Sequence, residues 1–152
     1  IAIISDGIYK LTYDDFLKLG INPELINPLN IRIYGNGGGL LPVVNNQYRP
    51  DDLQENAIHV EGESDGTFDK ADYVIFYGKG QDKWSLTNGD NRFHHQRNFY
   101  ADTAFYFLNT DLGVGKRIQT QASLPNSNIT VTTFDDYQFY ELDRFNFIKS
   151  GF

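Results

Sequence analysis

The sequence predicts a mainly β fold: a β-sandwich or jelly-roll-like domain with one short N-terminal helix. The chain has 10 Tyr and 12 Phe residues, which favour half-buried pleated surfaces, and 14 Gly residues, which supply turns. Short segments rich in Ile, Val, Thr, Tyr and Phe recur along it, each bounded by Gly, Asn, Asp or Pro. With 152 residues it has the size of one domain and can bury about two-thirds of the surface of its unfolded chain.

The first elements are two strands followed by the helix. The strands are predicted at Ile1–Ile4 and Gly7–Leu11. Thr12 is placed to cap the helix, with Asp15 three residues later in a capping-box arrangement, and Gly20 ends it. The apolar side of the helix is predicted to be Phe16, Leu17 and Leu19. Pro23 and Pro28 prevent the helix from continuing.

Most later elements are predicted as strands. They are Ile31–Tyr34, Ala57–Val60, Tyr73–Tyr77, Thr103–Leu108, Ile129–Thr133 and Tyr137–Leu142. Asn88-Gly89 predicts a tight turn that joins Trp84–Leu86 to a strand at Phe93. About eight to ten short strands with one helix favour a sandwich or jelly roll over a parallel βαβ sheet. No long linker interrupts the pattern, so residues 1–152 are predicted to be a single domain.

Composition excludes several classes of function. The net charge of −7 argues against a nucleic-acid partner, because phosphate binding requires clustered Lys and Arg. The sequence has no run of 18 apolar residues, so no transmembrane segment is predicted. The chain has no Cys, which excludes disulfides, thiolate metal sites and a Cys nucleophile within these residues.

The sharpest local motif is an acidic segment between two predicted strands. Its candidate oxygen ligands follow the spacing of an EF-hand-like calcium loop and are Glu61, Glu63, Asp65, Thr67 (through its carbonyl), Asp69 and Asp72. Gly66 falls where such a loop needs a sharp turn, so the motif predicts a Ca²⁺ site. The second interpretation is an acidic hairpin loop in which Asp65-Gly66 simply makes the turn. The Glu at the first position and the strand-like flanks favour the turn.

Three other patterns carry no recognisable chemistry. The run Gly35–Gly39 is predicted to be a turn or bulge, because no Lys-Ser/Thr pair follows it as in a phosphate loop. His94 and His95 are adjacent, so in a strand they face opposite sides and cannot chelate one metal, and His59 is remote in sequence. No Ser lies in a G-x-S-x-G motif. We therefore predict that this fragment is not an enzyme.

The aromatic clusters allow two interpretations, a buried sandwich core or an exposed platform for sugars. The core is favoured, because any sandwich of this composition buries such residues. Trp84, beside Lys83, is the best candidate for stacking on a sugar ring. Combined with the acidic segment, it makes a calcium-dependent carbohydrate-binding or adhesion module the alternative function.

Several short phrases follow one another in a characteristic order along the chain. They are Gly7–Leu11, Phe16–Gly20, Asn30–Gly39, Leu41-Pro42, Asp52-Leu53, Ala57–Val60, Gly62–Gly66 with Phe68-Asp69, Asp72–Gly78, Trp84, Phe93-His94, Asn98–Asp102 and Tyr106–Leu108. Their order resembles that of the PorU family of type IX secretion sortases, which are gingipain-like cysteine peptidases of Bacteroidetes. The resemblance covers nearly the whole chain and matches the region that precedes the peptidase domain. It implies a non-catalytic N-terminal domain excised from a longer chain, whose catalytic Cys and His lie beyond Phe152.

The resemblance also implies a role. Members of the family lie at the cell surface in association with the outer membrane, where the peptidase removes a sorting domain from secreted cargo and helps attach the cargo to lipopolysaccharide. This domain is then expected to pack on the downstream peptidase domain or to dock other outer-membrane components of the secretion system. A prosegment-like chaperone or inhibitor of the peptidase is a related expectation, with a loop near Lys79 or Arg92 entering the active site.

Overall fold

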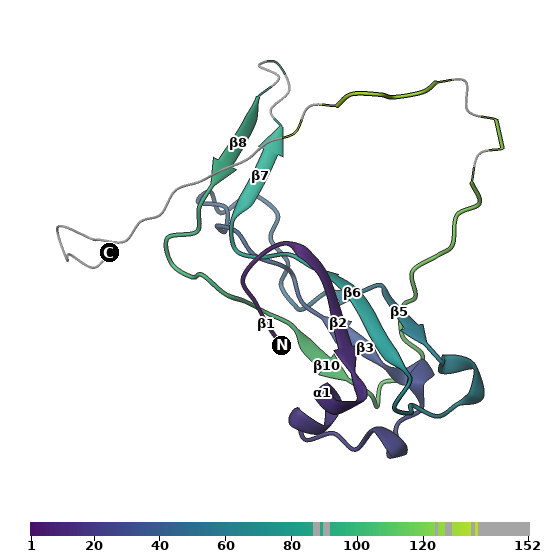
Figure 1. The fold of residues 1–152 in the computed structure, drawn as a ribbon. Coiled ribbons are helices and arrows are strands. Elements are labelled where there is room, and N and C mark those ends of the chain that lie inside the picture. Colours follow the sequence, from purple (N-terminus) through teal and green to yellow (C-terminus); the bar gives the residue numbers. More distant parts are fainter. Residues whose placement is uncertain (87–88, 90–91, 124, 127–128, 135, 137–152) are drawn as a thin grey trace.

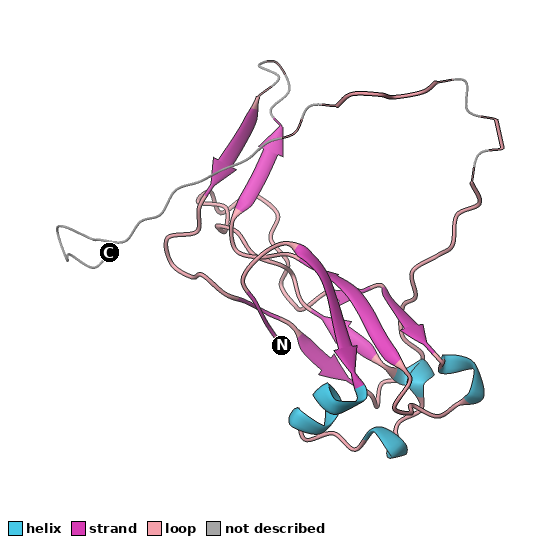
Figure 2. Cartoon of the chain, viewed as in Figure 1, coloured by secondary structure: helices cyan, strands magenta, loops and turns pink. Residues whose placement is uncertain are grey.

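The computed structural model describes residues 1–86, 89, 92–123, 125–126, 129–134 and 136, and its main body is built from two small antiparallel sheets (Figures 1 and 2). The first sheet has the strand order β2-β6-β5, with bounds Gly7–Thr12, Tyr73–Gly78 and Ile58–Glu61. The second has the order β10-β3-β4, with bounds Phe107–Asn109, Arg32–Tyr34 and Glu55–Asn56. Two strand pairs complete the set: β1 (Ala2–Ile3) with β9 (Ala104–Phe105), and β7 (Lys83–Leu86) with β8 (Phe93–Gln96).

The first sheet has one buried and one open face because its side chains alternate. Leu11 lies opposite Val74, and Phe76 lies between Tyr9 and Ile58, with these side chains directed to the core. The intervening residues form the outer sheet face, which comprises Ile8, Lys10, Ile75, Tyr77, Tyr73 and His59. Such alternation is typical of an antiparallel sheet with one face toward solvent.

A single apolar core joins the two sheets. Ile33 of the second sheet belongs to the same buried cluster as Val74 and Phe76 of the first. Tyr106, between β9 and β10, contacts Phe76 with ring centroids 5.6 Å apart. At the helical end, Phe16 packs on Phe68 with centroids 4.7 Å apart. Two layers of sheet around one core confirm the predicted mainly β class with one short helix.

The helix α1 (Tyr13–Lys18) begins and ends where the sequence predicts. Asp15 accepts hydrogen bonds from the Thr12 backbone N–H, at 3.0 Å, and from the Thr12 hydroxyl, at 2.7 Å. Gly20 follows the helix with φ of 79°, a conformation that glycine adopts readily. The predicted apolar side is wrong in part: Phe16 is buried, but the side chains of Leu17 and Leu19 are exposed. Adjacent helical side chains point about 100° apart around the axis, so Leu17 cannot share the buried direction of Phe16, and Leu19 lies after the last helical residue, Lys18.

Two 3₁₀ turns follow the helix, η1 (Pro23–Leu25) and η2 (Pro28–Asn30), and each starts with a proline after an asparagine cap. A third, η3 (Glu63–Asp65), lies in the acidic segment. No helix in the described part of the chain is long and apolar enough to cross a membrane.

Two arginines hold the segment after β10 against the body. Arg32 donates to the carbonyl oxygens of Leu112, Gly113 and Val114 at 2.8–3.0 Å. Arg117 donates to the carbonyl oxygens of Pro28 and Leu29 at 2.9 Å, and to Glu63 Oε2 at 2.6 Å. The Ile58 N–H donates to the Lys116 carbonyl, and the Ile118 N–H donates to the Ile58 carbonyl. These contacts cover the edge of β5 at its first residue, Ile58.

Three of the predicted strands differ from the observed elements or lie outside the described residues. The predicted strand Ile129–Thr133 is wrong, because these residues form no strand in the structure. Its residues favour strands, but a strand also requires a hydrogen-bonded neighbour, and the side chain of Val131 is 73% exposed. The predicted strand Thr103–Leu108 is interrupted at Tyr106, which separates β9 from β10. The predicted strand Tyr137–Leu142 lies outside the described residues.

Candidate functional site

The acidic segment forms a turn whose carboxylates bind the loop's own backbone. Asp65 Oδ1 accepts from the Thr67 backbone N–H, at 2.9 Å, and from its hydroxyl, at 3.0 Å, and these bonds lower the pKa of Asp65. Asp72 Oδ2 accepts from the Asp69 N–H at 2.8 Å, and Asp69 Oδ1 accepts from the Ala71 N–H at 2.8 Å. Side-chain bonds to nearby backbone of this kind are typical of Asx turns.

The remaining predicted calcium ligands point to other partners. Glu63 forms the ion pair with Arg117, and Glu61 Oε2 lies 3.2 Å from His59 Nε2 on β5. Within the described residues, no group of three or more His, Asp or Glu side chains is close enough to hold a metal ion. A calcium ion would therefore have to displace the Arg117 contact to recruit Glu63, and calcium binding by this segment stays a prediction.

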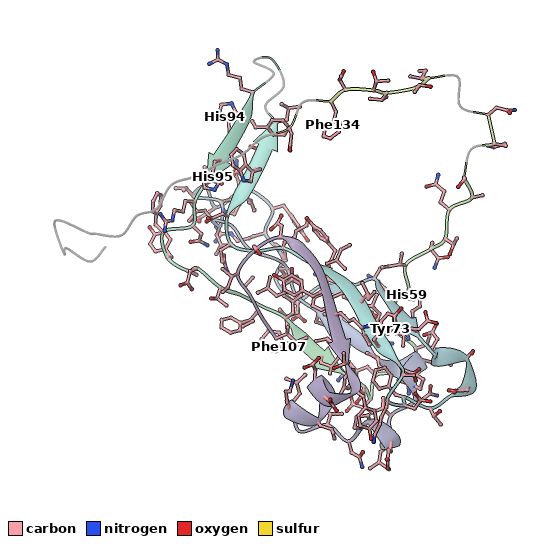
Figure 3. All side chains as sticks on the ribbon, viewed as in Figure 1. His59, Tyr73, His94, His95, Phe107 and Phe134 are labelled. Atoms are coloured by element: carbon pink, nitrogen blue, oxygen red, sulfur yellow. The ribbon has the colours of Figure 1, made fainter. Side chains whose placement is uncertain are left out.

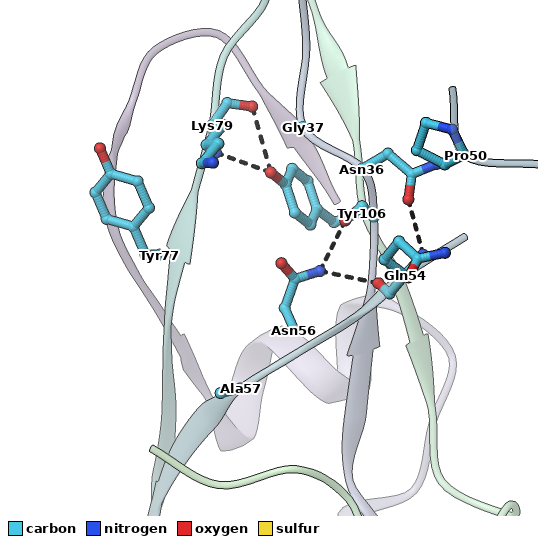
Figure 4. A pocket seen from close by; sticks show the side chains of 10 residues that line it. Asn36, Gly37, Pro50, Gln54, Asn56, Ala57, Tyr77, Lys79 and Tyr106 are labelled. Atoms are coloured by element: carbon cyan, nitrogen blue, oxygen red, sulfur yellow. Dashed lines mark hydrogen bonds between the residues drawn. The ribbon is translucent and has the colours of Figure 1, made fainter. Parts of the chain in front are cut away.

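A first cleft, of about 370 Å³, lies between the glycine-rich run and the end of β6 (Figure 4). The hydroxyl of Tyr106 accepts from the Lys79 backbone N–H at 2.8 Å, and burial raises the pKa of this phenol. Asn56 Nδ2 donates to the carbonyl oxygens of Gly35, at 2.9 Å, and Gln54, at 3.2 Å. The polar side chains of this cleft are thus engaged with backbone, which indicates a structural role.

The glycine-rich run owes its composition to close packing beside this cleft. A Cβ atom at Gly35 would come within 2.5 Å of the Tyr106 ring, and one at Gly38 would collide with the backbone at Gly80. The run therefore lets two segments of chain approach closely. The run was predicted to be a turn or bulge, and in the structure it is an irregular segment after β3.

A second cleft, of about 580 Å³, lies at the foot of the β7–β8 hairpin and combines aromatic and acidic groups. We call it the hairpin cleft, and its lining residues are Ile4, Ser5, Asp6, Tyr77, Gly80, Asp82, Trp84 and His95. Trp84 and His95 are directly opposite each other in the hairpin, with ring centroids 4.8 Å apart. The Asp6 carboxylate accepts from the Gly80 N–H at 2.7 Å, and Asp82 accepts from the Asn98 N–H at 2.9 Å.

The hairpin cleft also brings together a serine, a histidine and an aspartate, but not in a catalytic arrangement. Asp82 Oδ2 lies 3.8 Å from His95 Nε2, which is beyond hydrogen-bonding distance. No hydrogen bond joins the Ser5 hydroxyl to His95 in the described part of the chain. A nucleophile needs a base within about 2.6–3.2 Å, so the described residues contain no activated serine here.

The other predicted residues are spread over the molecule (Figure 3). His94 lies opposite Ser85 and His95 opposite Trp84, so the two histidines face opposite sides of β8, as predicted. His59 lies on β5, away from both. Trp84 follows β6, whereas the acidic segment precedes it, so the strand separates the sugar-stacking candidate from the calcium candidate.

The hairpin cleft was not predicted from the sequence. Its residues come from three separate stretches: 4–6, 77–82, and the paired strands that carry Trp84 and His95. The only sequence signal was Trp84 itself. No sequence signal marked Asp6, because its hydrogen bond from the Gly80 N–H depends on where Gly80 lies in the fold.

Comparison with known proteins finds similarity in structure alone. No protein-family model matches the chain, and no curated protein sequence matches it. Among solved structures, the chain is similar to the dimeric latent PorU from Porphyromonas gingivalis, with 22% sequence identity and a TM-score of 0.57. The match covers 80% of this chain and 10% of that one, so the chain corresponds to about a tenth of the solved protein. The chain therefore has a PorU-like fold.

Proposed function

We propose that this chain is a non-catalytic accessory domain of a longer, surface-located protein that acts in type IX secretion. The observation that carries the proposal is the PorU-like fold, which extends over most of this chain and a small part of that protein. A domain of that relative size fits an appended module that packs on a peptidase domain or docks partners at the outer membrane.

The surface of the domain supports a docking role. The outer sheet face leaves Ile8 75% exposed and Tyr77 52% exposed, and the two are directly opposite each other in β2 and β6. Ile4 is exposed beside them and lines the hairpin cleft together with Tyr77. Contiguous exposed apolar side chains on a sheet are typical of contact surfaces. We expect this face to be covered in the complete protein or its complex.

The first test is to read the residues encoded after Phe152. We expect a Cys/His peptidase domain, and an unrelated continuation would overturn the proposal. The second test mixes the 152-residue chain with the separately produced remainder of the protein and measures association by sedimentation.

A matched pair of variants locates the contact. Ile8→Asp should weaken the association, because it places a charge on the outer sheet face. Leu25→Asp serves as the control, because Leu25 is 84% exposed and lies in η1, outside that face. Neither change removes a buried side chain, so both variants should fold. Equal effects of the two substitutions would argue against docking through this face.

The inhibitor version of the function concerns the β7–β8 hairpin, which projects from the body (Figure 1). Arg92 immediately precedes β8, whereas Lys79 lies in the first cleft with its backbone bound to Tyr106. Arg92 is thus the better of the two candidates for entering a peptidase cleft. A purified peptidase domain would be inhibited by the wild-type chain and less by Arg92→Ala if this version holds.

A further inference from the structure

We propose that the hairpin cleft binds a Lys or Arg side chain of an extended partner polypeptide. The inference rests on the proposed docking function and gives it a site and a class of partner. It can fail on its own, because the domain could dock through the outer sheet face without using the cleft.

The cleft lies where the outer sheet face meets the foot of the β7–β8 hairpin. On one side is the outer sheet face, which ends at Tyr77. On the other is one face of the hairpin, where Trp84 pairs with His95 and Leu86 pairs with Phe93. Because paired strand residues alternate between faces, these four side chains share one side of the hairpin. Together the two surfaces form a continuous strip that matches an extended polypeptide.

The charge of the cleft selects a cation. Asp6 and Asp82 line it together with His95, and no Lys or Arg is among the described residues that line it. One oxygen of each carboxylate is held by a backbone N–H, from Gly80 and Asn98 respectively, which fixes the carboxylates in place. The second Asp6 oxygen remains to accept a hydrogen bond from an ammonium or guanidinium group, and such charge-assisted bonds are the strong ones. The second Asp82 oxygen, Oδ2, lies 3.8 Å from His95 Nε2, so a cation bound between the carboxylates would share it with that imidazole.

The aromatic walls favour the same ligand. Tyr77 and Trp84 line the cleft, and a cation over an aromatic ring gains further attraction. The outer sheet face already contains such a pair, because Lys10 Nζ lies 3.8 Å from the centre of the Tyr73 ring. A basic side chain from a partner would repeat this arrangement next to two carboxylates.

The flanks of the cleft argue for a polypeptide instead of a sugar. Exposed Leu86 and Phe93 extend the strip along the hairpin, and exposed Ile8 extends it along the sheet. Apolar side chains on either side of the basic residue would cover them. A sugar ring could stack on Trp84, but its hydroxyl groups would gain nothing from these apolar flanks.

The test uses Trp84 as a reporter, because the chain contains a single Trp. The probe is acetyl-Leu-Arg-Leu-amide, titrated into the 152-residue chain while the Trp emission is recorded. The neutral control is the same peptide with citrulline in place of arginine. We expect a saturable change with the arginine peptide alone, and we expect it to weaken as salt is added.

Charge-matched variants assign the effect to the cleft. The double variant Asp6→Asn, Asp82→Asn keeps the shape of each side chain and its carbonyl acceptor. It should lower the affinity for the arginine peptide by about tenfold or more. The control double variant Asp14→Asn, Asp51→Asn removes the same charge from exposed positions outside the cleft and should bind like the wild type.

Three results would overturn the inference. They are no saturable change with the arginine peptide, equal binding of the citrulline peptide, or equal losses in the two double variants. A response to N-acetylglucosamine oligomers but not to the arginine peptide would identify a sugar site instead. If the arginine peptide does not bind but the chain still associates with the remainder of its protein, the proposed site in the cleft is refuted and the docking function stands. If both fail, the docking function is refuted too.

Discussion

At the scale of single residues, Tyr106 joins three parts of the fold. It is 2% exposed, packs on Phe76 with the two rings tilted by 50°, and its hydroxyl accepts a hydrogen bond from the backbone of Lys79. It also lies against Gly35, which has no side chain to block the ring. A buried phenol that satisfies a buried N–H is a common way to combine apolar packing with a fixed polar contact.

Replacing Tyr106 with Phe should destabilise the domain by roughly 1–3 kcal/mol, because the Lys79 N–H would lose its acceptor in a part-buried position. The measurement is the free energy of unfolding from urea denaturation. Tyr100→Phe is the control, because Tyr100 is exposed, and it should change this free energy by less than about 0.5 kcal/mol. If Tyr106→Phe leaves the free energy of unfolding unchanged, a water molecule accepts the Lys79 N–H in place of the hydroxyl.

Asp15 should make the stability of the domain depend on pH. Hydrogen bonds from Lys18 and from Thr12 lower the pKa of Asp15 in the folded state. A lowered folded pKa stabilises the protein above the unfolded value, about 3.9, and this contribution is lost as pH falls through the folded pKa. Asp15→Asn should therefore cost about 1 kcal/mol at pH 7, as for other lost helix caps, and progressively less below pH 4. Urea unfolding at pH 7 and pH 3 checks this, and an equal cost at both values contradicts it.

At the scale of elements, the acidic segment shows how one set of residues can satisfy two patterns. Its spacing matches a calcium loop, and its contacts match a turn between β5 and β6. In the turn, Gly62 and Gly66 both adopt positive φ, and Asp65 and Asp72 bond nearby backbone N–H groups. The carboxylates are therefore already satisfied without a metal, which favours the turn.

A thermal melt in excess EDTA and in millimolar Ca²⁺ decides between the two interpretations. A ligand that binds only the folded state at 100 times its dissociation constant adds about 2.7 kcal/mol, or several degrees in Tm. The calcium hypothesis predicts such a rise, and its loss in Asp65→Ala but not in the exposed control Asp51→Ala. The turn hypothesis predicts no difference between the two melts.

At the scale of the whole molecule, the contacts that hold the described residues to the body extend as far as Ile118. Among the described residues, the buried apolar cluster runs from Ile3 to Tyr106, and the last position with a backbone hydrogen bond to the body is Ile118, whose N–H donates to the Ile58 carbonyl. In the described part beyond it, Ile129, Val131 and Phe134 expose most of their side chains. The body should therefore be a self-sufficient folding unit.

A chain truncated after Gln119 should unfold with nearly the same free energy as the full 152 residues, within about 0.5 kcal/mol. The reason is that, among the described residues, the truncation removes none that belong to the buried cluster. Urea denaturation of both chains under the same conditions gives the comparison. A loss of more than about 1 kcal/mol would mean that residues after 119 pack on the body.

The sequence alone determined the local features of this protein, because these depend on neighbouring residues. The strands at Gly7–Leu11 and Tyr73–Tyr77, the Thr12–Asp15 cap and the Gly20 stop were all predicted, and each is present. Strand propensity was not enough for Ile129–Thr133, because pairing depends on a partner strand that local sequence does not specify. The hairpin cleft was likewise decided by tertiary structure, since only the folded chain brings Asp6 to Gly80 and Tyr77 to Trp84.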